Sequence, residues 1–227
     1  MTVISDQSVL DGFVTPGNGR RIPLALDDGI ASTVASGAPP ASRFPSGAAP
    51  LTVGAAALTF QLTAEVAPPL VSGQALQATH IVQKGNEVYV AYAMIGEPTL
   101  GAVDVFTLER NVPRLLSRAT FTTTEYYAVE IHGSDLFLVG STSDSGFTDR
   151  AVLDVVDVSR KVLPSPLAAI RLQLPSYAGT GVSADGKYVW VTSGSGGPNV
   201  GGLSIYDKKK LALVDRIAFL DARGVFS

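Results

Sequence analysis

Short runs of hydrophobic residues, separated by turn signals, follow one another from residue 78 to residue 220. Four such runs occur in each of three consecutive units, 78–124, 125–176 and 177–220. Runs rich in Val, Ile, Leu, Tyr and Phe and bounded by Gly, Asn, Asp or Ser are typical of β-strands. The pattern therefore predicts three units of four strands each.

Equivalent strands recur at a nearly constant spacing. The third strands of the three units start 50 residues apart, at Val103, Leu153 and Leu203. Four strands in a period of this length are the sequence signature of a β-propeller blade. The runs are nearly continuous rather than alternating, as expected for sheets that are covered on both faces. We therefore predict an all-β fold, a partial β-propeller of about three four-stranded antiparallel blades.

Turn residues support these strand boundaries. The first and second strands of each unit are separated by Gly85-Asn86, Gly133-Ser134 and Asp185-Gly186. Glycine and asparagine accept the positive φ that a tight hairpin requires, so we expect such positions in these turns. Trp190 lies inside the second strand of the third unit, and we expect it in the core.

The first part of the chain has a different character. Residues 1–50 are rich in Gly, Ala, Pro and Ser, and stretches such as Ser36–Ser42 do not fit helix interiors or central strands. We expect an irregular leader there, with a weak strand at Arg21–Leu26. Leu58–Val66 alternates apolar and polar residues and predicts one N-terminal strand. The predicted organisation is a leader over 1–50 and a partial propeller over 51–227.

Residues 221–227 resemble the start of a fourth unit. Arg223-Gly224-Val225 matches Thr180-Gly181-Val182 at the start of the third unit. Because one blade does not bury both of its faces alone, we expect this chain to be the N-terminal half of a longer protein. On its own it should expose an apolar blade face or edge and self-associate.

Composition narrows the function classes. A net charge of −3 and a pI near 5.3 give no reason to expect nucleic acid or an anionic membrane as partner. No apolar run is long enough for a transmembrane segment, and the first residues lack the features of a signal peptide. The absence of cysteine excludes disulfides and thiolate nucleophiles. The compartment stays open on these grounds.

The third-strand segments carry a family resemblance: Val103–Phe106, Leu153–Val158 and Leu203–Asp207. Together with second-strand segments such as Asp185–Val191, they resemble the LVIVD-repeat proteins, a bacterial propeller-like group often found as exported or surface lipoproteins. The resemblance covers residues 78–227. It implies the propeller fold and a periplasmic or cell-surface location, and it implies no reaction. This chain has no lipobox cysteine.

Several motifs are compatible with cofactor or metal binding only in part. Gly179–Ala184 matches the dinucleotide pattern G-x-G-x-x-A, but a turn and a strand follow it instead of the required helix. Gly194–Pro198 lacks the Lys-Ser/Thr ending of a phosphate-binding loop. The acidic loop Asp144–Asp149 offers two carboxylates, too few for calcium, and His80 and His132 lack metal-ligand spacing. We therefore predict no cofactor and no metal.

Five residues are candidate ligand contacts at the channel or rim of the propeller: His80, Tyr126, Tyr127, Glu130 and Arg223. First strands border the central channel, which is why the histidine is included, and Arg223 belongs to the expected first strand of the fourth unit. Aromatic and acidic side chains leading into the first strand of unit two suit a binding site at the rim. The alternative is structural, with a hydrogen-bonded histidine and tyrosines that fill the space between blades.

The leading hypothesis is a non-enzymatic propeller scaffold for a protein or glycan partner, without catalytic residues. The alternative is a small-molecule-binding or enzymatic propeller whose site is completed by missing blades. Convergent His, Asp, Glu or Arg side chains at the channel mouth would favour the alternative, whereas small residues and backbone would favour the scaffold. The fold by itself does not decide between them.

Overall fold

The computed structural model describes residues 1–17, 21–23, 59–94, 96–110, 112–167, 169–194 and 201–218. The larger part of the predicted leader and the predicted start of a fourth unit, with Arg223, lie outside the described residues. The chain divides into two compact units, one formed by Met1–Thr15 with Val66–Ser227 and the other by Pro16–Glu65. The first unit contains all of the repeats.

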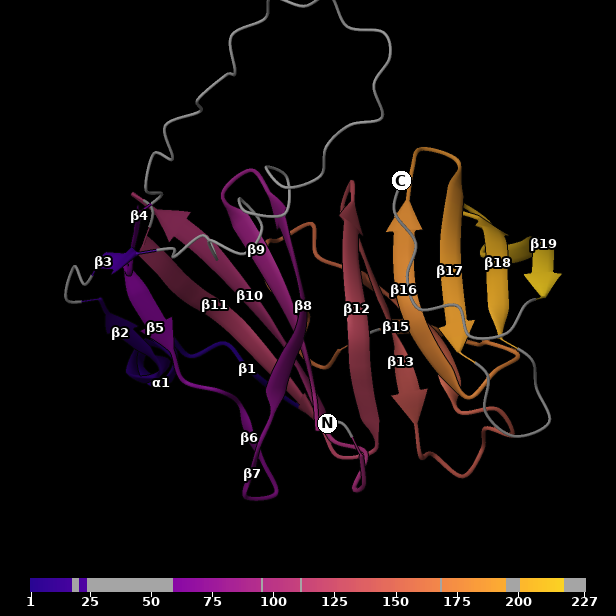
Figure 1. Ribbon diagram of the computed structural model, residues 1–227, viewed down its shortest axis with the longest axis horizontal. Coiled ribbons are helices and arrows are strands. Elements are labelled where there is room, and N and C mark those ends of the chain that lie inside the picture. The colour runs from indigo at the N-terminus through magenta and orange to yellow at the C-terminus, as the bar shows by residue number, and fades with distance from the viewer. Residues whose placement is uncertain are drawn as a thin grey trace, which may run out of the picture. The chain divides into compact units, whose positions relative to one another are not determined.

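Three antiparallel sheets, each following chain order, make up most of the first unit (Figure 1). Sheet 1 contains β8 (Gln77–Lys84), β9 (Glu87–Ala93), β10 (Gly101–Glu109) and β11 (Val112–Phe121). Sheet 2 contains β12 (Thr124–His132), β13 (Asp135–Thr142), β14 (Ala151–Asp157) and β15 (Ala169–Gln173). Sheet 3 contains β16 (Ala178–Ala184), β17 (Tyr188–Gly194), β18 (Gly202–Asp207) and β19 (Ala212–Ala218). The predicted all-β class and the four-stranded antiparallel units are confirmed.

Hydrophobic clusters join the sheets in the same way twice. The face of a sheet that is turned to the next sheet along the chain is called its forward face, and the opposite face is its rear face. The forward face of sheet 1 packs on the rear face of sheet 2 through Tyr89, Val103, Val105, Leu136, Leu138 and Val156. The forward face of sheet 2 packs on the rear face of sheet 3 through Phe137, Val139, Leu153, Val189, Val191 and Tyr206.

Burial along the strands follows from this stacking. Every residue of β13 after Asp135 is buried, because sheets cover both faces of sheet 2. In β19, by contrast, six of the seven residues are exposed. Trp190, expected in the core, is only half-buried, because no sheet among the described residues packs on the forward face of sheet 3.

The rear face of sheet 1 is covered by the N-terminal part of the chain. Residues 1–16 form β1 (Thr2–Ile4), α1 (Gln7–Leu10), a 3-10 helix (Asp11–Phe13) and β2 (Val14–Pro16). Strand β1 pairs with β11, which makes sheet 1 five-stranded, and Asp6 caps α1 by accepting from the Ser8 backbone N–H at 2.9 Å. Val88, Val90 and Phe106 then pack against Leu10, Val71 and Leu76. The prediction of an irregular leader is therefore wrong for residues 1–16, whose elements are too short to show a period in the sequence.

The predicted strand Leu58–Val66 is also corrected. It consists of two short strands, β4 (Thr59–Gln61) and β5 (Ala64–Val66), separated by two residues outside any strand. Strand β4 pairs with β3 (Arg21–Pro23), which lies where the weak N-terminal strand was expected. A further hairpin joins β6 (Leu70–Val71) and β7 (Gln74–Ala75). The interruption ends the ladder of β4, so the alternation does not continue as one strand.

The hairpin turns separate into two kinds. Gly85 and Gly133 have positive φ, 59° and 65°, as the sequence predicted. Gly186 does not, so the prediction of positive φ is wrong for that turn. There, the Asp185 carboxylate accepts hydrogen bonds from the backbone N–H groups of Lys187 and Tyr188 at 2.6 and 2.7 Å. The side chain thus closes this turn in place of a left-handed glycine.

Candidate functional site

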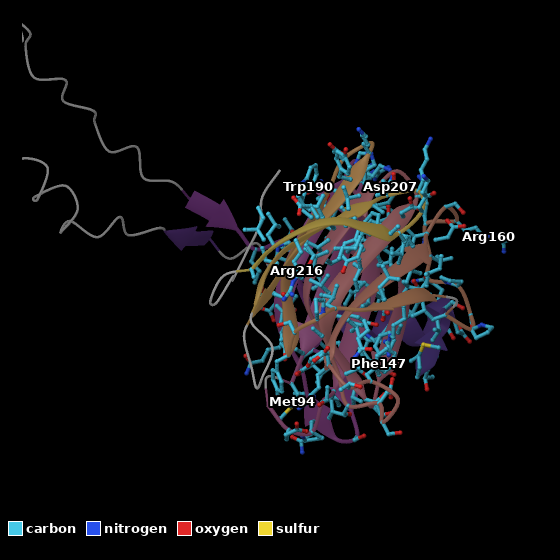
Figure 2. The ribbon with its side chains drawn as sticks, turned by 90° about the vertical axis from the view of Figure 1, so that its right-hand side faces the viewer. Met94, Phe147, Arg160, Trp190, Asp207 and Arg216 are labelled. Carbon is cyan, nitrogen blue, oxygen red and sulfur yellow. The ribbon has the colours of Figure 1, made fainter. Side chains whose placement is uncertain are left out.

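The connections between second and third strands of sheets 1 and 2 lie at one end of the sheets. Met94, after β9, and Phe147, after β13, lie at this end, whereas Trp190 and Asp207 lie toward the other end (Figure 2). The segments that lead into the first strands of sheets 2 and 3 reach the same end, because those strands run in the opposite direction to the second strands. Loops from successive sheets therefore meet here.

Arg150, which immediately precedes β14, is the centre of a polar network at this end. Its Nη1 donates to Glu97 Oε1 at 3.1 Å and to the Tyr177 hydroxyl at 2.7 Å. Its Nη2 donates to Thr99 Oγ1 at 2.6 Å, and its Nε donates to the Thr142 carbonyl at 3.2 Å. The guanidinium also lies over the Tyr177 ring, 5.0 Å from its centroid. One side chain thus links the connection β9–β10, the end of β13 and the residue before β16.

A buried carboxylate lies beside Arg150. Glu125, at the start of β12, accepts hydrogen bonds from the Tyr127 hydroxyl and from Ser141 Oγ, the latter at 3.1 Å. Tyr127 is the extra residue of a β-bulge between β12 and β13, and bulges redirect side chains in this way. Gly140 allows the close approach of the strands, since a Cβ there would collide with the Glu125 carbonyl. Burial is the main cause that raises the pKa of Tyr127, so its hydroxyl stays a donor at neutral pH.

A cavity of about 250 Å³ adjoins this network. Arg171 of β15 forms a bidentate pair with Asp154 of β14, Nε to Oδ1 at 2.8 Å and Nη2 to Oδ2 at 2.7 Å, and it also binds Asp144 Oδ2 at 2.9 Å. The Tyr126 hydroxyl donates to Asp154 Oδ2 at 2.5 Å. Arg171 reaches Thr124 Oγ1 at 3.2 Å as well. These five side chains line the cavity together with apolar residues.

The sequence analysis missed both arginines and the paired aspartate. Asp154 belongs to a third-strand position that recurs in sheet 1 as Asp104, 50 residues earlier, and Asp104 also pairs with an arginine, Arg118, across β10 and β11. This recurrence was the available signal. No comparable signal in the sequence pointed to Arg150, because its partners are up to 53 residues away in sequence.

The predicted site residues do not lie together. Tyr126 lines the cavity and Tyr127 lies in the Glu125 cluster, so these two belong to the loop-bearing end. His80 accepts a hydrogen bond from the Val129 backbone N–H through Nδ1 at 3.4 Å, as the structural alternative expected. Glu130 lies near the hairpin turn at the opposite end of β12, where burial raises its pKa although a hydrogen bond from the Ile131 backbone N–H acts in the other direction. Arg223 lies outside the described residues.

The motifs with partial matches have structural contexts of their own. Gly179–Ala184 lies in β16 and is followed by a turn and β17, so the helix that would receive a pyrophosphate is not there. Asp144, in the acidic loop, is bound by Arg171. Among the described residues, no group of three or more His, Cys, Asp or Glu side chains is placed to hold a metal ion. In the same part of the chain, no helix is long and apolar enough to cross a membrane.

Comparison with known proteins adds a distant structural likeness. No family model matches the chain, and no curated protein matches it. One solved structure that it resembles, from Bacteroides uniformis, is provisionally described as a 6-phosphogluconolactonase. The likeness has a TM-score of 0.45 at 16% identity and covers 73% of this chain and 52% of that chain. This chain thus spans about half the length of that structure.

Proposed function

We propose that the three sheets are successive blades of a partial β-propeller and that the protein is a non-enzymatic binding scaffold. The support is the repeated packing of one forward face on the next rear face, which is how propeller blades stack. The resemblance to exported LVIVD-repeat proteins belongs to the same proposal and would place the scaffold in the periplasm or on the cell surface. A scaffold of this kind binds through its loops and blade faces.

The loop-bearing end is the proposed binding site, and a glycan is the proposed ligand. The single observation that carries this is that Arg150, beside sheet 2, binds side chains from segments next to sheet 1 and sheet 3. Tyr177 is 46% exposed and offers a ring for a sugar to stack on, while Glu97 and Tyr127 offer partners for sugar hydroxyls. Arg150 uses four donors within the described residues, which leaves one of its five N–H groups for a ligand.

An enzymatic role is the second reading, and the cavity gives it less support. Asp144 and Asp154 both accept hydrogen bonds from Arg171, and Asp154 also accepts from Tyr126. A glycosidase needs two carboxyl groups that act as acid and as nucleophile or base. Carboxylates that are occupied by one guanidinium are better suited to hold the loops in place, so we favour binding over catalysis.

The test is a glycan array probed with the full chain, followed by calorimetric titration of any hit. We expect binding that Tyr177→Ala weakens about tenfold, because a stacked ring is lost. Tyr188→Ala, which removes a tyrosine beside the Asp185 turn at the other end of sheet 3, is the matched control and should leave the affinity unchanged. Absence of any glycan binding, or binding that Tyr177→Ala and Arg150→Ala both leave intact, would contradict the proposal.

A further inference from the structure

The forward face of sheet 3 repeats the positions that join the other sheets. In the cross-strand register, Trp190 lies opposite Ile205, just as Tyr89 lies opposite Val105 in sheet 1 and Phe137 opposite Val155 in sheet 2. Leu203 and Ile217 continue this face and likewise form a cross-strand pair. Figure 2 views the molecule from the side of sheet 3, to which the labelled Trp190 and Arg216 belong. Trp190 is part of the forward face, whereas Arg216, opposite Ser204, is part of the rear face.

The equivalent residues differ in their surroundings. Tyr89 is 1% exposed and Phe137 is fully buried, because each belongs to a cluster that includes the rear face of the following sheet. Trp190 is half-buried, and Ile217 is 51% exposed. Among the described residues, none of the three hydrophobic clusters contains Trp190, Leu203, Ile205 or Ile217. An apolar face of this kind on a stable sheet marks an interaction surface.

We infer that the forward face of sheet 3 docks the rear face of a further four-stranded blade, a partner that carries Val, Leu or Tyr at alternate facing positions. This inference rests on the proposed propeller arrangement. Both interfaces between sheets in the chain join a forward face to a rear face, so the interface repeats in one sense only. The incoming face should therefore resemble Val189, Val191 and Tyr206 of sheet 3.

A second copy of this chain is a poorer occupant. Among the described residues, the one rear face that is not packed on another four-stranded sheet belongs to sheet 1. Leu10, Val71 and Leu76 of the same chain already pack on part of it and leave a groove of about 330 Å³ beside Ile81 and Val88. Edge-to-edge pairing through β19 is also disfavoured, since Lys208, Lys209 and Lys210 form the turn that leads into this edge strand. The partner is thus expected to approach the face of sheet 3 rather than its edge.

One polar contact can be anticipated at this interface. In sheet 1, Ser117 lies opposite Val105, and its hydroxyl accepts a hydrogen bond at 2.9 Å from the Leu163 backbone N–H, which lies between β14 and β15 of the next sheet. In sheet 3 the equivalent residue opposite Ile205 is Asp215, which is exposed. Its carboxylate should accept from the same connection of the docked blade, between that blade's third and fourth strands.

The experiment supplies a blade of known sequence. A second copy of residues 174–218 is joined to the C-terminal end of the full chain, so that the added blade follows sheet 3 in the sequence. Trp190 is the one tryptophan of the chain, and the added copy carries Trp190→Phe, so fluorescence reports on the original face alone. We expect a blue-shifted emission, several-fold weaker quenching by acrylamide and a higher unfolding midpoint than for the unextended full chain.

A matched control carries Val191→Asp in the added copy only, which places a charge on its rear face. This variant should show the emission and quenching of the unextended full chain. If Trp190 is as accessible to acrylamide with the intact added blade as without it, the inference fails. If the unextended full chain instead forms a dimer in light scattering, with Trp190 protected and with Trp190→Glu restoring the monomer, a second copy is the occupant and the inference is overturned.

These outcomes are separate from the test of the glycan site. Tyr177 and Arg150 lie at the loop-bearing end, whereas Trp190 reports on the forward face of sheet 3 (Figure 2). Glycan binding can therefore be absent while the added blade docks, and docking of the added blade can be absent while glycan binding is retained.

Discussion

The Asp104–Arg118 pair of sheet 1 and the Asp154–Arg171 pair of sheet 2 have the same geometry in different surroundings. In each, the aspartate of the third strand receives Nε and Nη2 of an arginine directly opposite on the fourth strand, at 2.7 to 2.8 Å. Arg118 and Asp104 are 2% and 0% exposed, whereas Arg171 is 23% exposed and lines a cavity. The two ion pairs are formed by the same groups, but Arg118 is buried and Arg171 is partly exposed.

The difference comes from what lies on the rear face of each sheet. Arg118 lies against the Phe13 ring, 4.5 Å from its centroid, and also donates to the Ala67 carbonyl at 3.3 Å, so the N-terminal elements seal it. Arg171 meets Thr124 and Asp144, which leave an opening. The same aspartate–arginine pair thus joins the third and fourth strands in both sheets. Only the segments that cover the pair determine whether it also lines a site.

The largest expected effect is from Asp104→Ala. The change leaves the Arg118 guanidinium buried without its carboxylate, so the free energy of unfolding should fall by about 3–5 kcal/mol. Urea denaturation measures this. The double variant Asp104→Ala/Arg118→Met removes both charges and should recover a large part of the loss. If the single variant is within about 1 kcal/mol of the parent, the pair is not a closed structural unit.

Asp154→Ala should have a smaller effect, on the order of 2 kcal/mol, because Arg171 keeps Asp144 and is open to water through the cavity. The same urea titration compares the two sites directly. A loss as large as that from Asp104→Ala would mean that the cavity does not relieve the unpaired arginine. Added salt should narrow the difference between Asp154→Ala and the parent more than that between Asp104→Ala and the parent.

Each pair also binds a tyrosine hydroxyl, Tyr92 to Asp104 and Tyr126 to Asp154. Burial, followed by the negative charge of the aspartate, raises the pKa of both hydroxyls above the ordinary value of 10.0. A pKa raised in the folded state means that this contribution to stability is fully present below pH 10.0 and is lost as the pH rises above it.

Alkaline denaturation of Tyr92→Phe and Tyr126→Phe tests whether these two hydroxyls make stability depend on pH. At neutral pH each should lose on the order of 1 kcal/mol through the missing hydrogen bond. Above pH 10.0 each variant should lose less further stability than the parent, since one buried hydroxyl no longer has to ionise on unfolding. Stability curves that run parallel to that of the parent would show that these hydroxyls do not couple folding to pH.

The sheets could be predicted from the sequence because their strands are local apolar runs, and Val103, Leu153 and Leu203 mark the repeat directly. The site could be predicted only in part. Tyr126 and Tyr127 stood out as adjacent aromatic residues, yet Arg150 has partners 27 and 53 residues away, in segments next to other sheets. Contacts of that kind depend on how the sheets stack, which no short window of sequence contains.

The paired aspartates show the same limit more sharply. Their spacing of 50 residues is visible in the sequence, but the arginines follow them by 14 and 17 residues. The tyrosines come from different strands, β9 for Tyr92 and β12 for Tyr126. Strand lengths and connections that vary between units change these offsets, so position in the repeat did not identify the partners.

Sheet 3 offers the smallest and most specific test of the comparison. Ser204 occupies the position of Asp104 and Asp154, and Arg216 lies directly opposite it. Ser204→Asp would recreate the aspartate–arginine arrangement at a buried position. The net contribution of a buried ion pair to stability is close to zero, so the free energy of unfolding should change by less than about 1 kcal/mol. Ser193→Asp is the matched control, because it places the same charge at a buried serine that faces Gly202, and it should destabilise by several times more. Equal losses from the two changes, measured by urea denaturation, would show that the arginine opposite the third strand is not the feature that makes an aspartate acceptable there.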